Sequence, residues 1–472
     1  KWKAGQFRNL KANAPYFETL ANSHLAIELQ KVGYEVERNK RDFEVKGFGR
    51  DTIKKFSNRT KQIEDKAKEL GLTYVEDKAA LGAKTRARKR KNLDREDLWK
   101  EWKSRLSSED LDLVYNSKGT PPDGGDSKGL ALEKTKEISA EKALEYSLNH
   151  NLERKSTTTE KEIYIHALKR SYGSVSPEEI GKELASRKDL LTKQDEQENT
   201  IYTTQSALAE EQNLKKAARE GRGLMKPIND GYSIKNDELS PEQANAVHHV
   251  LKSKDFITIV SGGAGTGKTW SIKEVAEGVR EQGVNFGAFA PSSAASRGVQ
   301  RDDGFKDATT IADLLQNENL QASLKNGVIW IDEAGMVGNK TMNSIIDIAK
   351  KQEARILLTG DIKQHNAVER GDALRIIQKY GGVQPARISK IQRQKVDNYR
   401  TAVEYISDGK MIEGIKTLDS MNAIKEASDF TTLKGNVATE YVQSVKAKED
   451  TLIVATTHAQ GISVTDSIRQ KL

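Results

Sequence analysis

The sequence has no cysteine among its 472 residues, which excludes disulfide frameworks and cysteine-based zinc sites. No apolar stretch approaches the roughly 18 residues that a membrane-spanning helix requires. The first residues, KWKAGQFRNL, lack the pattern of a secretory signal. These absences lead us to expect a protein that does not insert into membranes and works in a reducing compartment such as the cytoplasm. The chain begins without Met and ends in a helical pattern, SVTDSIRQKL, so we expect a piece of a longer protein.

Charge, by contrast, is abundant. Charged residues make up 31% of the chain, and the formal net charge is +8. A basic balance favours a polyanionic partner, usually a nucleic acid, although simple solubility is an alternative reason for it. The densest basic cluster is KTRARKRK at 84–91. It fits either a solvated helix face or a set of phosphate contacts.

The composition of the sequence and the spacing of its apolar residues change along the chain. Apolar residues recur at helical spacing over 15–33, and two alternating stretches follow at 34–48, which predicts a helix and then a hairpin. A stretch rich in Gly, Pro and Asp, SKGTPPDGGDSKG at 117–129, is typical of a linker. Residues 133–225 are polar and have a helical pattern.

Beyond residue 231, short apolar runs alternate with helical patterns. Buried runs of this length, separated by helices, indicate an α/β domain with a mostly parallel sheet. The predicted strands are FITIV (256–260), NFGAFA (285–290), VIWIDEA (328–334), RILLTG (355–360), ARISKI (386–391) and TLIVATT (451–457).

The stretch SGGAGTGKTW at 261–270 matches the phosphate-loop pattern GxxxxGK[ST] and lies between a predicted strand and a predicted helix. Its glycines let consecutive backbone N–H groups face one anion at a helix N-terminus. Lys268 would reach the β- and γ-phosphates, and the Thr269 hydroxyl would bind Mg²⁺. The alternative is an accidental glycine-rich turn. The residues predicted to bind ATP here are Gly262, Gly263, Ala264, Gly265, Thr266, Gly267, Lys268 and Thr269.

A second candidate element is the acid pair Asp332-Glu333 at the end of VIWIDEA. Ligands of open α/β sheets bind at the carboxyl ends of the strands. Asp332 therefore fits a Mg²⁺-holding acid, and Glu333 fits a base that orients and deprotonates the attacking water. The alternative is a pair that caps a helix.

Other stretches of the sequence help to decide which class of nucleotide-hydrolysing protein this is. A GTPase would carry a base-reading NKxD motif, but Asn339-Lys340 is followed by Thr341 and Met342. Gln243, in LSPEQANAVHHVL, offers an amide donor and acceptor that suit an adenine edge. The stretches FAPSSAASRGV, LLTGDIKQ and ISKIQRQ add hydroxyls, Gln364 and Arg393. A small-molecule kinase would not account for SPEQ or GDIKQ.

With these motifs in this order, residues 239–393 resemble superfamily 1 helicases of the RecD-like group. The resemblance implies that Gln243 reads adenine, that Gln364 couples the γ-phosphate to the DNA site, and that Arg393 acts as an arginine finger. It also implies single-strand contacts from APSSAAS and ATTIADLL. The candidate DNA-binding residues are Ser292, Ser293, Arg297 and Thr310.

Upstream, PYFETLANSHLAIELQKVGYEVERNKRDFEVKGF and KTRARKRKNLDREDLWKEW resemble the C-terminal part of a TrwC-type relaxase domain. The resemblance implies a MobF-type protein that nicks plasmid DNA and unwinds it for conjugation, with the conjugation machinery as a further partner. The family's catalytic tyrosines and histidine cluster are not in this chain, so nicking is not assigned to it.

Together these patterns predict a RecA-like P-loop NTPase domain with a mostly parallel sheet, preceded by an α+β relaxase remnant and a helical accessory segment. The expected function is that of an ATP-dependent DNA helicase with ATP and Mg²⁺ as cofactors. The alternative is a non-catalytic module that binds nucleotide and single-stranded DNA. The predicted parts are 1–116 (relaxase), 117–132 (linker), 133–230 (accessory), 231–395 (motor) and 396–472 (the start of a second RecA-like domain).

Overall fold

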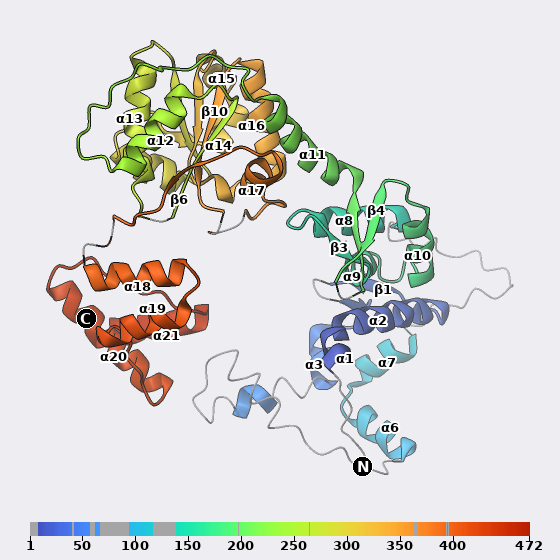
Figure 1. Ribbon diagram of the computed structural model, residues 1–472. Helices are drawn as coiled ribbons and strands as arrows, with labels where there is room; N and C mark the ends of the chain where they lie inside the picture. Colours follow the sequence, from blue (N-terminus) through green and yellow to red (C-terminus); the bar gives the residue numbers. More distant parts are fainter. Residues whose placement is uncertain are drawn as a thin grey trace, which may run out of the picture. The chain divides into compact units, whose positions relative to one another are not determined.

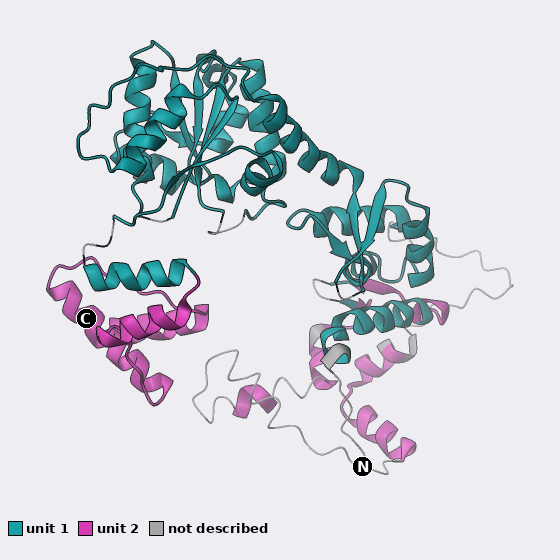
Figure 2. Cartoon of the chain, in the orientation of Figure 1, with its two compact units in different colours: residues 1–28, 38–43, 127–408 teal, residues 29–37, 44–126, 409–472 magenta. Residues whose placement is uncertain are grey.

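A computed structural model describes most of the chain, and four predictions lie outside the described residues: the basic cluster 84–91, the linker 117–132, Ala264 and Arg393. The described residues are 8–39, 42–56, 62–66, 94–116, 138–196, 198–263, 265–362, 364, 367–392, 394 and 396–472. The chain divides into two compact units (Figure 2). One comprises Lys1–Glu28, Arg38–Phe43 and Ser127–Asp408, and the other Leu29–Glu37, Glu44–Asp126 and Gly409–Leu472.

A six-stranded sheet with the order β11-β6-β10-β9-β7-β8 forms the centre of the first unit (Figure 1). Every registered strand pair in it is parallel, which confirms the predicted mostly parallel sheet. The strands are β6 (Ile257–Gly262), β7 (Phe286–Ala290), β8 (Thr309–Thr310), β9 (Val328–Ile331), β10 (Arg355–Gly360) and β11 (Ala386–Ile388). Five of them fall within or beside predicted apolar runs; the short β8 was not predicted as a strand.

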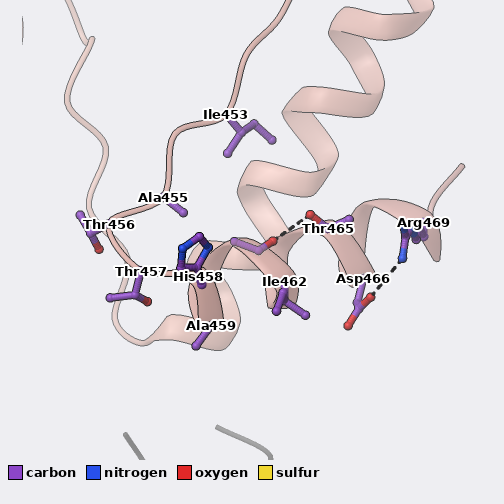
Figure 3. Close-up of a pocket in the computed structure, with 11 residues that line it drawn as sticks. Ile453, Ala455, Thr456, Thr457, His458, Ala459, Ile462, Thr465, Asp466 and Arg469 are labelled. Atoms are coloured by element: carbon purple, nitrogen blue, oxygen red, sulfur yellow. Dashed lines mark hydrogen bonds and ion pairs between the residues drawn. The ribbon is translucent and has the colours of Figure 1, made fainter. Parts of the chain in front are cut away.

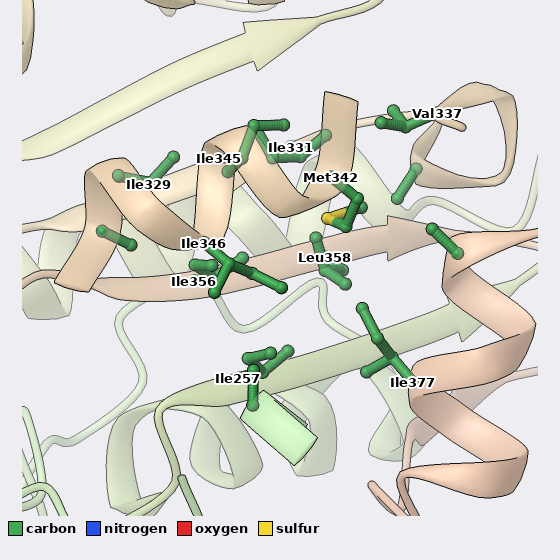
Figure 4. Close-up of a cluster of buried hydrophobic side chains, with 14 of the residues drawn as sticks. Ile257, Ile329, Ile331, Val337, Met342, Ile345, Ile346, Ile356, Leu358 and Ile377 are labelled. Atoms are coloured by element: carbon green, nitrogen blue, oxygen red, sulfur yellow. The ribbon is translucent and has the colours of Figure 1, made fainter. Parts of the chain in front are cut away.

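Helices cover both faces of this sheet because its strands are apolar on both sides, as parallel strands usually are. On one face, Trp330 and Leu357 pack with α12 (Pro241–Lys252) and α13 (Lys268–Arg280). On the other face, Ile329, Ile331 and Ile356 pack with α16 (Asn339–Lys351) (Figure 4). Full burial of such a side chain stabilises the fold by about 1.5–3 kcal/mol. Truncating one of them, for example Ile329→Ala, costs about 2–5 kcal/mol because a cavity remains.

Shorter elements connect the strands of this sheet. Two of them are π-helical, a rare conformation that often occurs at functional sites. The elements are η1 (Ala294–Gln300, π), α14 (Ile311–Gln316), α15 (Glu318–Ser323), η2 (Ala334–Met336, 3₁₀), α17 (Ala373–Arg375), η3 (Ile376–Tyr380, π) and, after the sheet, α18 (Asp397–Ser407).

The accessory segment is helical as predicted, but it also contains a small antiparallel sheet that the sequence analysis missed. Its order is β3-β5-β4, with β4 (Leu190–Gln194) and β5 (Thr200–Thr204) forming a hairpin. The alternating, β-branched stretch TIYTT was the available signal. The other elements are α8 (Ala140–Leu152), β3 (Thr158–Thr159), α9 (Glu160–Arg170), α10 (Pro177–Ser186) and α11 (Gln205–Glu220).

At the N-terminal end, a helix followed by a two-stranded sheet confirms the predicted helix and hairpin. The elements are α1 (Arg8–Ala12), α2 (Ala14–Lys31), β1 (Val36–Arg38), β2 (Phe43–Val45), α3 (Arg50–Phe56), α6 (Arg95–Ser104) and α7 (Ser108–Asn116).

The C-terminal part of the second unit contains α19 (Met411–Ser420), α20 (Phe430–Lys446) and α21 (His458–Arg469). The strand predicted at 451–457 is wrong, because no residue of that stretch is in a strand. Leu452 and Val454 are 86% and 85% exposed instead. A strand forms only where a neighbour pairs with its backbone. Among the described residues, no strand lies beside this stretch to pair with it.

Candidate functional site

The glycine-rich loop joins β6 to α13, and its backbone conformation explains its glycines. Gly265 and Gly267 have φ of 74° and 82°, in the left-handed region that favours glycine. Gly267 caps α13, and a Cβ added to it would lie 2.4 Å from Gln243 Nε2. A Cβ on Gly262 would lie 2.6 Å from the Ile388 carbonyl oxygen. The loop is therefore a tight backbone turn that ends at a helix N-terminus, the geometry that binds phosphates.

The Lys268 side chain folds back over this loop. Its Nζ donates to the carbonyl oxygens of Gly262 at 2.8 Å and Gly263 at 3.0 Å. These partners keep the ammonium group at the mouth of the turn. A phosphate that entered would offer it a charged acceptor, and charge-assisted hydrogen bonds are about twice as strong as bonds to neutral carbonyls.

The acid pair follows β9 directly. Asp332 Oδ1 accepts from the Thr359 hydroxyl at 2.6 Å and from the Glu333 backbone N–H at 3.0 Å. Glu333 has a left-handed backbone, with φ of 49° and ψ of 42°. This conformation is uncommon for a residue other than glycine, and such residues cluster at active sites.

One cavity of about 600 Å³ joins these elements at the carboxyl edge of the sheet. Thr269 and Asp332 both line it, so a hydroxyl and a carboxylate oxygen face the same space. Oxygen ligands completed by water and substrate phosphates are what Mg²⁺ prefers, so the donor set fits that ion. The lining residues are Glu238, Ser240, Gln243, Gly265, Thr266, Gly267, Lys268, Thr269, Trp270, Asp332, Glu333 and Gln392.

Gln243 lines the cavity, and its amide already has protein partners at both ends. Its Oε1 accepts from the Ser240 N–H at 2.9 Å as part of a capping box. Its Nε2 donates to the carbonyl oxygens of Thr266 at 3.3 Å and Gly267 at 3.2 Å. Gln243 thus braces the phosphate loop against α12, and its predicted contact with adenine stays a prediction.

Hydrogen bonds also connect the segment after β11 to this site. The Glu242 carboxylate accepts from the backbone N–H and the hydroxyl of Ser389, both at 2.7 Å. The Ser389 donors hold the pKa of Glu242 below its ordinary value. Further along, the Gln392 N–H donates to the Gly265 carbonyl at 2.7 Å. The sequence analysis missed Glu242, Gln392 and Trp270; only the position of Trp270, directly after Lys268-Thr269, offered a signal.

The remaining predicted site residues are spread more widely. The Gln364 N–H donates to the Asp361 carbonyl at 3.2 Å just after β10, and Gln364 is not among the lining residues of the cavity. Ser292, Ser293 and Arg297 are exposed at the start of η1 and within it. The Thr310 hydroxyl accepts from the Asp313 N–H at 3.2 Å and caps α14.

A second cavity, of about 800 Å³, lies in the C-terminal part of the other unit (Figure 3). Its wall is formed by both apolar and polar residues from 453–469, with His458 at the start of α21. An ion pair joins Asp466 Oδ1 and Arg469 Nη1 at 3.8 Å, and both side chains are exposed. None of the predicted site residues lies there.

Two family models match separate parts of the chain. A TrwC relaxase model matches residues 1–108, and an AAA domain model matches residues 238–429. The second range contains the phosphate loop, the acid pair and the loop after β10. The chain therefore combines a relaxase-like part with a helicase-like part.

Curated relatives agree with this assignment. A conjugal transfer protein TraA of Rhizobium radiobacter is 31% identical over 207 residues, covering 43% of this chain and 18% of that protein. An ATP-dependent RecD2 DNA helicase of Deinococcus radiodurans is 28% identical over 167 residues, covering 34% and 22%. The chain thus spans less than a quarter of these relatives. The chain has a TrwC-like part and a RecD-like part, which confirms the predicted resemblance to MobF-type relaxase–helicases.

Among solved structures, the Pif1 helicase of Candida albicans is similar at 21% identity, with a TM-score of 0.28, over 36% of this chain and 44% of that one. Within the described part of the chain, no helix is both long and apolar enough to cross a membrane.

Proposed function

We propose that this chain is the ATP-hydrolysing, DNA-translocating part of a conjugative relaxase that unwinds plasmid DNA for transfer. One observation carries the proposal: Lys268, Thr269, Asp332 and Glu333 line a single cavity at the carboxyl edge of the parallel sheet. A phosphate-binding turn, oxygen ligands for a cation and a carboxylate base are the parts that phosphoryl transfer to water needs.

Different residues of the chain have different roles in binding and hydrolysing ATP. The N–H groups of the loop and Lys268 bind and orient the phosphates of ATP, and Thr269 and Asp332 hold Mg²⁺. When bound, Mg²⁺ supplies charge neutralisation at the phosphate oxygens. Glu333 orients the attacking water and accepts its proton. Arg393 stabilises charge as an arginine finger, and Gln364 links the phosphate site to the DNA.

Single-stranded DNA binds, in this proposal, along the exposed start of η1, through Ser292, Ser293 and Arg297, with Thr310 nearby. The relatives whose names mention conjugal transfer and a DNA helicase support a DNA substrate and a role in conjugal transfer. We further propose that the protein acts in the bacterial cytoplasm together with the conjugation machinery. The proposed division of the chain remains 1–116, 117–132, 133–230, 231–395 and 396–472.

ATP hydrolysis by this chain, measured with and without single-stranded DNA, tests the function. We expect hydrolysis that DNA stimulates, in parallel with binding of a fluorescently labelled single strand. Binding of nucleotide and DNA without any hydrolysis would instead favour the non-catalytic module. Phosphate transfer to a small acceptor would favour a kinase.

A further inference from the structure

Two consecutive hydrogen bonds lead from the interior of the sheet to Asp332. The indole Nε1 of Trp330 donates to Thr359 Oγ1 at 2.8 Å, and Thr359 Oγ1 donates to Asp332 Oδ1 at 2.6 Å. Trp330 and Thr359 are both 0% exposed. Both lie in stretches that the sequence analysis singled out, VIWIDEA and RILLTG, but neither was predicted to have a role at the site.

The register of two neighbouring strands creates this arrangement. Leu358 of β10 pairs with Ile331 of β9, so the next residues along each strand, Thr359 and Asp332, are neighbours. Side chains alternate along a strand, which puts Trp330 and Asp332 on the same face as Thr359. The face is the one covered by α12 and α13, beside the phosphate loop.

The direction of the hydroxyl proton follows from the chemistry of the partners. An indole N–H can only donate, so the Thr359 oxygen acts as its acceptor. The one proton of Thr359 is then available for Asp332 Oδ1 at 2.6 Å or for the Ile331 carbonyl at 3.4 Å. The shorter contact is to a carboxylate, whose charge makes it the stronger acceptor.

From this geometry we infer that Thr359, itself oriented by Trp330, is a positioning residue for Asp332. Thr359 and the Glu333 N–H both donate to Oδ1, which fixes the rotation of the carboxylate and would leave Oδ2 to hold Mg²⁺. Outer-shell partners of this kind orient metal ligands. The inference rests on the proposed function, because it assigns a role relative to the Mg²⁺ of that site.

A purely structural role for Thr359 makes a different prediction. In that case the hydroxyl only satisfies the buried indole N–H, which would otherwise be costly to bury. Its removal would then lower stability without changing how the site responds to Mg²⁺. Stability and Mg²⁺ dependence therefore have to be measured separately.

Thr359→Val removes the hydroxyl and keeps the shape of the side chain. Binding of fluorescently labelled ADP is measured by anisotropy at increasing concentrations of MgCl₂, beside thermal melting. We expect the half-saturating Mg²⁺ concentration to rise about tenfold, the lower end of the usual effect of losing an outer-shell partner. Binding of labelled ADP in EDTA should stay as in the wild type. Thr359→Ser, which restores a hydroxyl, should return the Mg²⁺ dependence towards normal.

Trp330→Phe provides a second route should Thr359→Val fail to fold. It keeps the hydroxyl but removes the donor that directs it, so a smaller rise in half-saturating Mg²⁺ is expected. Thr258→Val is the matched control: Thr258 is 3% exposed on β6 and bonds Ser253 Oγ at 3.3 Å, not Asp332. It should change the melting temperature alone.

The possible outcomes distinguish a failure of the positioning role of Thr359 from a failure of the proposed nucleotide site. An unchanged Mg²⁺ dependence in Thr359→Val and Trp330→Phe, beside a Mg²⁺-dependent wild type, would overturn the positioning role. A wild type whose ADP binding ignores Mg²⁺ would count against the proposed nucleotide site itself.

Discussion

Arg370 binds Glu210 with two nitrogens of its guanidinium group, and this pair joins the loop after β10 to α11 of the accessory segment. Arg370 Nη1 also donates to the Leu152 carbonyl at 2.9 Å, and its backbone N–H donates to the Glu153 carbonyl at 3.0 Å. Both charged side chains are only about one-fifth exposed, at 19% and 20%. The loop that carries Gln364 is thus fixed at its far end to a different part of the chain.

Arg370→Ala should loosen this connection. It removes a bidentate pair and one carbonyl contact, so we expect a loss of about 1–3 kcal/mol in the free energy of unfolding, measured by urea denaturation. A double-mutant cycle with Glu210→Gln isolates the pair. The control is Arg375→Ala, since Arg375 pairs with Asp372 on the same loop but is 57% exposed. Equal losses in the two arginine variants would contradict a special role for Arg370.

The assigned roles of Lys268 and Glu333 predict different defects. Lys268→Ala should weaken ATP binding and abolish hydrolysis, since the phosphates lose their charged partner. Glu333→Gln keeps shape and hydrogen bonding, so ATP and Mg²⁺ should still bind while turnover falls by about a hundredfold or more. Nucleotide affinity and single-turnover rates distinguish the two variants.

Glu353→Gln is a matched control for Glu333→Gln. Glu353 has the same left-handed backbone, with φ of 53°, but lies at the turn before β10, at the other end of that strand from the site. It should leave turnover unchanged. The division of roles is wrong if Lys268→Ala and Glu333→Gln lose ATP binding equally.

Gln243→Ala tests the brace on the phosphate loop. We expect a stability loss of about 1 kcal/mol from the broken capping box and, in addition, weaker nucleotide binding, because the loop loses its contacts at Thr266 and Gly267. Glu179→Ala breaks an equivalent capping box on α10, away from the nucleotide cavity. Thermal melting and binding of labelled ADP should therefore separate the variants: both lose stability, but only Gln243→Ala loses affinity.

Salt dependence tests the proposed DNA contacts. Each phosphate neutralised on a single strand contributes about −0.7 to the slope of log affinity against log salt. Arg297→Ala should flatten the slope by about that amount. Arg280→Ala removes the same charge from an exposed arginine that pairs with Glu277 at the end of α13, and should leave the slope nearly unchanged.

Replacing the basic residues of 84–91 by serine tests that cluster in the same assay, and an unaltered slope would mark it as a solvated surface.

Much of the motor domain could be predicted because its signals are local. A phosphate loop, the strand before it and the helix after it occupy one continuous stretch, and the strand that precedes Asp332 is a continuous apolar run. Such patterns fix the type of element and the edge of the sheet where the polar residues gather.

The partners of these residues could not be predicted in the same way. Gln243 and Thr266 meet across 23 positions of sequence, and Trp330 and Thr359 across 29. The first pair meets because α12 lies beside the phosphate loop, and the second because β9 and β10 are neighbouring strands. A single sequence carries no signal for either arrangement. At the exposed stretch around Leu452, by contrast, the sequence predicted a strand that the structure lacks. Its composition favours a strand, but strand formation depends on a neighbour.

The position of β6 in the sheet also governs when the phosphate loop can form during synthesis. Its two neighbours, β10 and β11, both follow it in the chain, and β11 ends only at Ile388. The loop emerges from the ribosome long before the strands that flank it and before Gln392, which holds Gly265. Closing such long loops is slow. A nascent chain should therefore acquire nucleotide binding late and in one step, once the residues beyond β11 have left the exit tunnel.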